Sequence, residues 1–396
     1  MSPLRVVLVT RRFWPLVGGA ERVMANLATA LVDAGVSVTL LTACWERTWP
    51  REVIHRGVRV VRLEQPALRG WGTLRYMQRL ARWLRDEHHE FDLVYVSMLK
   101  HDAYAALSAS QRGDFPVVLR AEGAGATGDV AWQREGRCGG RIAARCRTAS
   151  AIVAPSPAIQ QELLGAGYPS TRVELIPNAV PIGPPRDGDA RREARASLAE
   201  AHPLLSLPAD APLAVYTGRL HAAKGLSDLI AAWRVVDLTW PAARLWIVGE
   251  GPQRRALAEQ IEDQQLSGRV VLCGAFDSID DFLTAADCFV LPSHEEGMSL
   301  ALVEAMAAGL PIVATDIEGN RQLVRHQQEG LLAPVGNAAA LAAAIGRLLA
   351  DRSQAAELGN AARRRVADEF SLAPWTARHL ELFERVLAEH RAVGGR

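Results

Sequence analysis

The chain has 396 residues, of which 49% are hydrophobic and 22% charged, and its formal net charge is +1. This length exceeds one typical hydrophobic core and suits two domains. No run of about 18 apolar residues occurs, so we expect no transmembrane helix. The short apolar run at 6–9 predicts a first strand rather than a signal peptide. Five scattered cysteines indicate neither a disulfide framework nor a zinc site, which favours a reducing, cytoplasmic environment.

The first 180 residues alternate short apolar runs with amphipathic stretches, the pattern of an α/β domain. We expect strands at 6–9, 38–41, 59–63, 93–96, 117–119 and 151–154. Helices are expected at 19–34 and 73–86, because each keeps its apolar residues on one face.

The two halves of the chain differ in charge. Residues 1–180 carry 23 Lys and Arg against 16 Asp and Glu, whereas the remainder carries 22 against 28. A basic first half favours an anionic partner there, such as a phospholipid surface or a phosphate-linked acceptor. The helix expected at 73–86 places four arginines on its polar face, and we interpret them first as a solvated face, with contact to a membrane surface as the alternative.

A break in composition follows Pro177-Asn178 and marks the connection between the domains. We expect domain boundaries of 1–180 for the first domain, 181–210 for a linker with a short helix at 190–200, 211–370 for the second domain and 371–396 for a terminal segment. Strands of the second domain are expected at 213–217, 244–248, 270–273, 288–291 and 311–315, followed by alanine-rich helices to residue 370 and a last helix at 374–389.

The most informative segment follows the apolar run 288–291 and opens a short helix. Ser299 is a good N-cap, and Gly309 is a good residue to end the helix. Glu296 precedes the helix and Glu304 lies about one turn inside it. Because a helix N-terminus offers free N–H groups and a positive dipole end, it suits a phosphate. A diphosphate there would have Glu304 near ribose hydroxyls and Glu296 near a sugar, as a nucleotide-sugar requires.

A second segment supports the same chemistry. Lysine occurs only at Lys100 and Lys224, and Lys224 follows the strand expected at 213–217. Gly218 permits a tight exit from that strand. Arg219 can bind phosphate oxygens bidentately, and Lys224 can act as a point charge.

Taken together, these motifs resemble the retaining glycosyltransferases of family four. The resemblance is carried by Glu296 and Glu304, by the tail Ala305-Met306-Ala307-Ala308-Gly309-Leu310-Pro311, and by Gly218-Arg219-Leu220 with Lys224-Gly225. It implies the GT-B fold, in which two Rossmann-like domains face each other across a cleft, and a terminal helix that crosses back to the first domain. It also implies that Arg219 and Lys224 hold the donor diphosphate.

The resemblance assigns further donor contacts. Gly18-Gly19 matches a glycine loop before the first helix, Gly249 matches a loop near the nucleobase, and Phe276 lies in the loop beside the base. The expected donor-binding set is Gly18, Gly19, Gly218, Arg219, Lys224, Gly249, Phe276, Glu296, Gly297, Met298, Ser299, Leu300 and Glu304. The expected catalytic residues are Arg219, Lys224, Glu296 and His101.

The acceptor side departs from the family pattern. Where many relatives carry a sugar-contacting histidine, this chain has Ser97, and His101 and Asp102 follow one turn later. Where relatives often have His-Gly, it has Glu122-Gly123 after Arg120. We expect Glu122, Arg120 and Asp102 on the acceptor side and His101 as a sugar contact.

The expected function is transfer of a sugar from a nucleoside-diphosphate sugar to a hydroxyl of a glycan, a lipid-linked acceptor or a small molecule, as in polysaccharide biosynthesis. No metal or other cofactor is expected to be required, because no Asp-x-Asp stands where a metal-bridging pair would be needed. The alternatives are a nucleotide-sugar epimerase of the same fold and a non-catalytic scaffold; a phosphorylase, which needs pyridoxal phosphate, ranks low. No nucleic-acid module is present. We expect a cytoplasmic enzyme, with peripheral contact to the inner membrane face left open.

Overall fold

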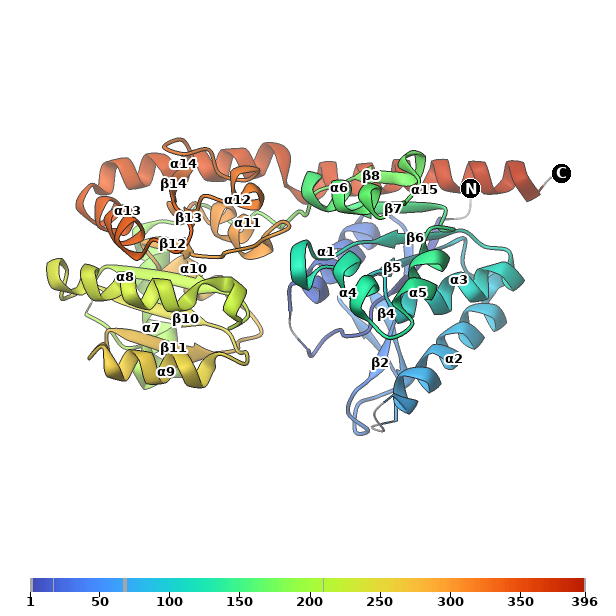
Figure 1. Cartoon of the computed structure of the whole chain (residues 1–396), viewed down its shortest axis with the longest axis horizontal. Helices are drawn as coiled ribbons and strands as arrows, with labels where there is room; N and C mark the ends of the chain where they lie inside the picture. Colours follow the sequence, from blue (N-terminus) through green and yellow to red (C-terminus); the bar gives the residue numbers. More distant parts are fainter. Residues whose placement is uncertain (1–2, 17, 67–69, 209, 395–396) are drawn as a thin grey trace. The chain divides into compact units, whose positions relative to one another are not determined.

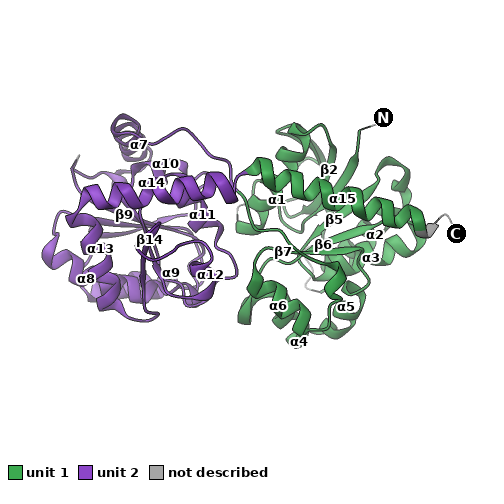
Figure 2. Cartoon of the chain, turned by 90° about the horizontal axis from the view of Figure 1, so that it is seen from above, with its two compact units in different colours: residues 1–179, 372–396 green, residues 180–371 purple. Residues whose placement is uncertain are grey.

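The computed structural model describes residues 3–16, 18–66, 70–208 and 210–394. It divides the chain into two compact units (Figures 1 and 2). Unit 1 consists of Met1–Ala179 together with Leu372–Arg396, and unit 2 consists of Val180–Ser371. Each unit has its own sheet and its own core.

In the described part of unit 1, eight strands form one sheet in the order β3-β4-β2-β1-β5-β6-β7-β8. Their bounds are β1 Arg5–Val9, β2 Ser37–Cys44, β3 Glu52–His55, β4 Val58–Glu64, β5 Leu93–Ser97, β6 Val117–Arg120, β7 Ala151–Ala154 and β8 Val173–Leu175. All pairs are parallel except β3 with β4. Because β2 and β5 pair with opposite edges of β1, the chain order reverses there, and the loops after β1 and β5 leave the same edge side by side.

The helices of unit 1 present apolar faces to this sheet. They are α1 Gly19–Asp33, α2 Trp71–Asp86, α3 His101–Gly113, α4 Asp129–Glu135, α5 Gly139–Cys146, α6 Pro157–Gly165 and α15 Leu372–Gly394, with short 3-10 turns at His88–Glu90, Gly125–Thr127 and Ser170–Arg172. The last of them, α15, packs beside α1 (Figure 2). It buries Trp375, His379 and Phe383, and the His379 and Phe383 rings meet the Tyr95 ring edge to face. The end of the chain therefore completes the core of unit 1.

Unit 2 has a parallel sheet in the order β11-β10-β9-β12-β13-β14. The strands are β9 Leu213–Thr217, β10 Arg244–Val248, β11 Val270–Gly274, β12 Cys288–Leu291, β13 Ile312–Thr315 and β14 Gly330–Ala333. Nearly every residue of β9, β10, β12 and β13 is buried, as expected for parallel strands covered on both faces. Here the order reverses at β9, which lies between β10 and β12.

The helices of unit 2 pack in pairs as well as on the sheet: α8 against α13, α10 against α7 and α11 against α14. Their bounds are α7 Gly188–Ala201, α8 Leu226–Thr239, α9 Arg254–Asp263, α10 Asp280–Ala285, α11 Leu300–Ala307, α12 Glu318–Arg321, α13 Ala338–Ala350 and α14 Arg352–Glu369, with 3-10 turns at Pro203–Leu205 and Ala222–Lys224. The core holds the fully buried Trp233, Trp246 and Phe282.

All eleven strands expected from the sequence are present, but three strands were not expected: β3, β8 and β14. Each is short, with three or four residues, and each lies at an edge of its sheet. The last helix is longer than the expected 374–389, because it begins at Leu372 and ends at Gly394. Among the described helices, none is both long enough and apolar enough to cross a membrane.

Candidate functional site

The strand order of unit 2 brings the two predicted motifs together. β9 and β12 are neighbours in the sheet, and the loops that follow them leave the same edge. In open parallel sheets, ligands bind outside the carboxyl ends of the strands where the strand order reverses. The segments with Lys224 and Glu296 both lie at this position.

The two loops touch through their backbones. Gly225 has a φ of +64°, and a Cβ on it would lie 2.0 Å from the carbonyl oxygen of Pro292. The main-chain N–H of His294 donates to the carbonyl of Ala223 at 2.8 Å. Only glycine allows this approach at residue 225, since both the left-handed backbone and the lack of space exclude a side chain.

An ion pair joins the two motifs. Lys224 Nζ lies 2.7 Å from Glu296 Oε1, and the hydroxyl of Ser293 donates to the same oxygen at 2.7 Å. The Glu296 side chain is 8% exposed, whereas that of Lys224 is 27% exposed. The lysine therefore has a side open to an anion while Glu296 is held in place from two directions. Burial, followed by the charge of Glu296, raises the pKa of the nearby Tyr216 hydroxyl well above its ordinary value.

Helix α11 begins directly beyond this pair. Ser299 is its N-cap, and the Ser299 hydroxyl accepts a hydrogen bond from the Leu302 N–H at 3.3 Å. Gly297 and Met298 lead into the cap, and Leu300 is the first helical residue. Glu304 lies within the helix and is half-buried. The first N–H groups of a helix lack partners within the helix and carry the positive end of its dipole.

Arg219 adds a cation on the surface of the same loop. Its side chain is exposed, and among the described residues its guanidinium has no hydrogen bond or ion pair. Its carbonyl is fixed, because it accepts a hydrogen bond from the buried Tyr216 hydroxyl at 3.1 Å. The backbone is thus anchored while the guanidinium is available to a ligand.

The loops after β10 and β11 close against this one. Gly249 donates through its N–H to the Gly274 carbonyl at 2.7 Å, and a Cβ on Gly249 would lie 1.9 Å from the Gly218 carbonyl oxygen. Phe276 is half-buried with its ring edge-on to Phe282, 4.6 Å between centroids. The donor residues predicted in unit 2 therefore all lie in the carboxyl-edge loops of neighbouring strands or in α11.

In unit 1, Gly18 and Gly19 lie after β1 and start α1. Gly18 is the N-cap in an extended conformation, φ −173°, so its backbone does not require glycine. A Cβ there would lie 2.3 Å from Glu21 Oε2, so a larger residue would require the flexible Glu21 carboxylate to move. Burial raises the pKa of the Glu21 carboxyl, an effect that Arg12 at 3.7 Å partly offsets. The Glu21 carboxylate thus lies against the glycine loop that the resemblance identified.

The loop after β5 carries His101 at the start of α3. The His101 ring lies edge-on to the Trp132 ring, with centroids 5.1 Å apart, and Lys100 Nζ lies 5.6 Å from the same ring. Burial, with the charges of Arg11 and Lys100, lowers the pKa of His101 below its ordinary value. The imidazole is therefore neutral near pH 7 and able to accept or donate a hydrogen bond.

The three residues expected on the acceptor side are largely buried. Arg120 is 0% exposed, and it binds Glu122 at 3.0 Å and the side-chain oxygen of Asn178. Asp102 is 5% exposed and accepts from Arg11 at 3.1 Å and from the Tyr76 hydroxyl at 3.3 Å. Both side chains are held mainly by protein groups, which suits residues that position their neighbours. Glu122 retains 11% side-chain exposure.

Several residues of these sites were not found from the sequence. Ser293 orients Glu296. The carboxylate of Asp129 accepts from the N–H groups of Leu99 and Glu122 and lies 3.9 Å from Lys100 Nζ. A serine directly after a buried strand is a signal that could have identified Ser293. Nothing local could have identified Asp129, because its partners are about 30 and seven residues away. Among the described residues, no three His, Cys, Asp or Glu side chains are placed to hold a metal ion.

Comparison with known families matches both units. The profile described as "Glycosyltransferase Family 4" matches residues 17–183, and that described as "Glycosyl transferases group 1" matches residues 211–351. The lipopolysaccharide core biosynthesis glycosyltransferase LpsE of Rhizobium meliloti (strain 1021) is 27% identical over 368 residues, 92% of this chain and 95% of the relative. A glycogen synthase of Mycobacterium tuberculosis (strain ATCC 25618 / H37Rv) is 29% identical over 399 residues, 93% of this chain and 91% of the relative.

Solved structures show the same fold. Sucrose-phosphate synthase from Thermosynechococcus elongatus superposes with a TM-score of 0.81 at 24% identity, covering 98% of this chain and 100% of that one. HepE of Anabaena, in complex with UDP and glucose, superposes with a TM-score of 0.77 at 21% identity, covering 96% and 99%. Two α/β units with parallel sheets thus define a protein of the GT-B fold. The chain belongs to the group 1, family 4 glycosyltransferases, and it is a glycosyltransferase enzyme.

Proposed function

We propose that the protein transfers a sugar, with retention of anomeric configuration, from a nucleoside-diphosphate sugar to a hydroxyl acceptor. The observation that carries this proposal is the ion pair between Lys224 and Glu296 at the point where the strand order of unit 2 reverses. A cation beside a helix N-terminus suits a diphosphate, and a carboxylate next to it suits sugar hydroxyls. Both groups are held by backbone contacts that need no ligand.

The leaving diphosphate is the group that most needs stabilisation. Arg219, Lys224 and the first N–H groups of α11 supply positive charge and donors before the reaction begins, so little reorganisation is needed. When the donor binds, its phosphate shares Lys224 with Glu296, and Glu296 turns its oxygens toward the sugar. Glu304 accepts hydrogen bonds from the ribose. With this much positive charge from the protein, no metal is required.

Retention follows from attack on the face that the diphosphate leaves. The bond between the anomeric carbon and the phosphate oxygen breaks, and a bond to the acceptor oxygen forms on the same side. The proton of the acceptor hydroxyl passes to the departing phosphate oxygen, so that no dedicated base is needed. We assign His101 as a contact to the transferred sugar. Glu122 is assigned to the acceptor, with Arg120 and Asp102 as positioning residues.

The test is calorimetric titration of the full chain with UDP-glucose and with GDP-mannose, each without added metal. UDP-glucose is the first probe because the structure of the fold neighbour HepE holds it. We expect one donor to bind, and Lys224→Ala to weaken it by at least about tenfold, because truncation removes a charge-assisted contact. The matched control is Arg255→Ala, an exposed cation on α9 paired with Glu259. A folded protein that binds no nucleotide-sugar, or a Lys224→Ala variant that binds as the wild type does, would refute the proposal.

We also propose that the acceptor is lipid-linked and reached from a membrane surface through α2. This helix exposes Trp71 and Leu74 at 48% and 45%, and it carries Arg75, Arg79, Arg82 and Arg85. Apolar side chains beside arginines are typical of helices that lie on anionic membranes. Cosedimentation with phosphatidylglycerol vesicles should be strong at low salt and weak at high salt, and absence of salt-sensitive binding would exclude this contact.

A further inference from the structure

Unit 2 contains a cavity of about 310 Å³ at the edge of the sheet opposite the loops that carry Lys224 and Glu296. It is lined by Pro212, Asp287 and Pro311, which directly precede β9, β12 and β13, respectively. The cavity is therefore at the amino edge of the sheet, whereas Lys224 and Glu296 follow β9 and β12 at the carboxyl edge. The rest of its wall comes from residues 185–191, the end of α11, the end of α13 and one face of α14.

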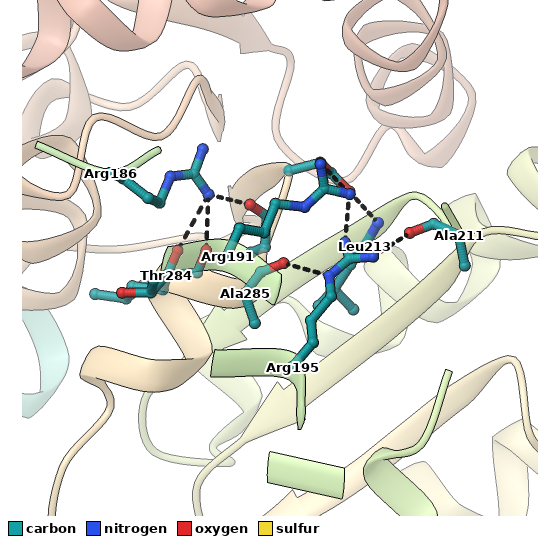
Figure 3. A network of polar contacts seen from close by, with 10 residues as sticks. Arg186, Arg191, Arg195, Ala211, Leu213, Thr284 and Ala285 are labelled. Atoms are coloured by element: carbon teal, nitrogen blue, oxygen red, sulfur yellow. Dashed lines mark hydrogen bonds and ion pairs between the residues drawn. The ribbon is translucent and has the colours of Figure 1, made fainter. Parts of the chain in front are cut away.

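Positive charge exceeds negative charge in this cavity. The described lining contains Arg186, Arg191, Arg352 and Arg363 but a single carboxylate, Asp287. That carboxylate is already shared. It lies 3.1 Å from Arg191 and 3.0 Å from the neighbouring Arg195, and it accepts from the Leu213 N–H at 2.8 Å. Figure 3 shows the side chains of Arg186, Arg191 and Arg195 gathered in this network.

Among the described residues, the remaining arginines of the lining form no ion pair. Where they form hydrogen bonds, the acceptors are neutral carbonyl groups. Arg186 donates through one nitrogen, Nη1, to the carbonyls of Leu283, Thr284 and Ala286, and among the described residues Nε and Nη2 have no hydrogen bond. Arg363 donates to the carbonyls of Ala307 and Gly183. These contacts hold the guanidinium groups in place without neutralising their charge.

Two further nitrogen groups lack partners. Arg191 Nε is buried and has no hydrogen-bond partner among the described residues. The guanidinium of Arg352, at the start of α14, is exposed and likewise has no hydrogen bond or ion pair there. Burial lowers the pKa of Arg186 to about 10. The charge of Asp287 opposes this shift in the pKa, whereas the charges of Arg191 and Arg195 add to it. The cluster is thus short of anionic charge.

We propose that this cavity binds a small phosphorylated compound. A phosphate group offers the dianionic charge that the cavity lacks, and its oxygens match the fork of a guanidinium. Four arginines around one cavity can bind such a group from several sides. The volume is at the lower end of the range for small-molecule sites, which suits a phosphorylated metabolite better than a whole nucleotide-sugar. The ligand would contact Ala308 and Gly309, at the far end of the helix whose start lies in the candidate donor site.

The test is calorimetric titration of the full chain with glycerol 3-phosphate and with inorganic phosphate. We expect binding by the wild type, and weakening of about tenfold or more in the Arg191→Gln and Arg352→Gln double variant. Lys224→Ala should bind as the wild type does, because Lys224 is at the other edge of the sheet. Arg255→Gln serves as the matched control for loss of a surface cation.

Three outcomes would overturn the proposal. They are no binding by the wild type at about 10 mM, an unchanged affinity in the double variant, and loss of binding in Lys224→Ala alone, which would place the phosphate in the donor site. If the double variant does not fold, Arg352→Gln by itself decides, since the side chain is exposed and its loss breaks no hydrogen bond or ion pair among the described residues. Failure here leaves the nucleotide-sugar titration unaffected, because the two experiments use different ligands and the Arg191 and Arg352 variants belong to this one alone.

Discussion

The hydroxyl of Ser97 donates a hydrogen bond to Glu122 Oε1 at 2.8 Å, and Arg120 Nε donates to the same oxygen at 3.0 Å. Ser97 and Glu122 are the two positions at which the sequence departs from the family's histidines. The structure shows that the two departures contact each other, because β5 and β6 are neighbours and Ser97 is paired with Arg120 in the sheet. Ser97, Arg120 and Glu122 therefore form one hydrogen-bonded cluster, and the two departures from the family pattern are structurally linked.

The first prediction concerns this cluster. Glu122→Gln leaves the fully buried Arg120 without a carboxylate, and an uncompensated buried charge costs about 3–5 kcal/mol. Ser97→Ala removes only one neutral donor and should cost about 1 kcal/mol. Urea unfolding followed by circular dichroism measures both free energies of unfolding. A Glu122→Gln variant no less stable than Ser97→Ala would show that the carboxylate does not support Arg120.

The second prediction concerns the contact between the β9 and β12 loops. Gly225→Ala places a methyl group 2.0 Å from the Pro292 carbonyl oxygen, whereas Gly268, with a similar φ of +76°, has open space around it. Gly268→Ala should therefore cost about 1 kcal/mol for the left-handed backbone alone. Gly225→Ala should cost roughly 1–3 kcal/mol more in stability because of overpacking. It should also weaken binding of the nucleotide-sugar by about tenfold.

Thermal unfolding and calorimetric titration of these two glycine variants separate strain from crowding. Equal effects of the two substitutions on stability would contradict the close contact. Weakened donor binding in Gly268→Ala would show that affinity responds to stability in general rather than to the spacing of the two loops.

The third prediction is a pH dependence of stability. His379 is fully buried, its Nδ1 lies 2.9 Å from the Trp375 carbonyl, and its Nε2 lies 3.2 Å from the Tyr95 hydroxyl. Nδ1 therefore donates and Nε2 accepts, which describes the neutral ring. Burial lowers the pKa of His379 from 6.5 to about 3. Between these values the unfolded chain binds a proton that the folded chain does not, so acid favours unfolding.

The free energy of unfolding should thus fall as the pH is lowered from about 6.5, by about 1.4 kcal/mol per pH unit from this group. Other buried acids also titrate, so the informative quantity is the difference between the wild type and His379→Gln. The wild type should lose more stability than the variant from pH 7 to pH 5. Parallel curves for the two proteins would mean that His379 is protonated in the folded state.

The fourth prediction separates binding from folding at Arg219. This side chain is exposed and makes no hydrogen bond or ion pair among the described residues, so Arg219→Ala should leave the melting temperature nearly unchanged. If the guanidinium stabilises the leaving diphosphate, kcat should fall roughly 10²-fold. Arg219→Lys should recover only part of the rate, because an ammonium cannot bind two phosphate oxygens in a fork. A normal rate for Arg219→Ala would remove it from the catalytic set.

Much of the fold could be predicted from periodicity. The eleven expected strands were apolar runs bounded by glycine, proline or polar residues, and burial on both faces makes such runs continuous. β3 was missed because it is an edge strand with Ile54 66% exposed, so it has no buried pattern. β14 likewise lies at an edge of its sheet, and it has only four residues.

The candidate site was predicted as a set of residues but not as an arrangement. Sequence spacing placed Lys224 and Glu296 each after a strand, yet their 2.7 Å contact depends on β9 and β12 being neighbours, which spacing does not state. Sequence pattern also does not predict which polar side chains are buried. Arg120 opens a polar, glycine-rich segment and Asp102 follows Lys100 and His101, so both positions indicate exposed loops, but both side chains lie inside.

The path of the chain through unit 1 has a consequence for how the protein is made. Because α15 supplies Trp375, His379 and Phe383 to that core, residues 1–179 leave the ribosome with a gap that is filled only when this helix follows. Unit 2 is complete before then. We therefore expect the second unit to fold before the first during synthesis, against the usual N-terminal-first order.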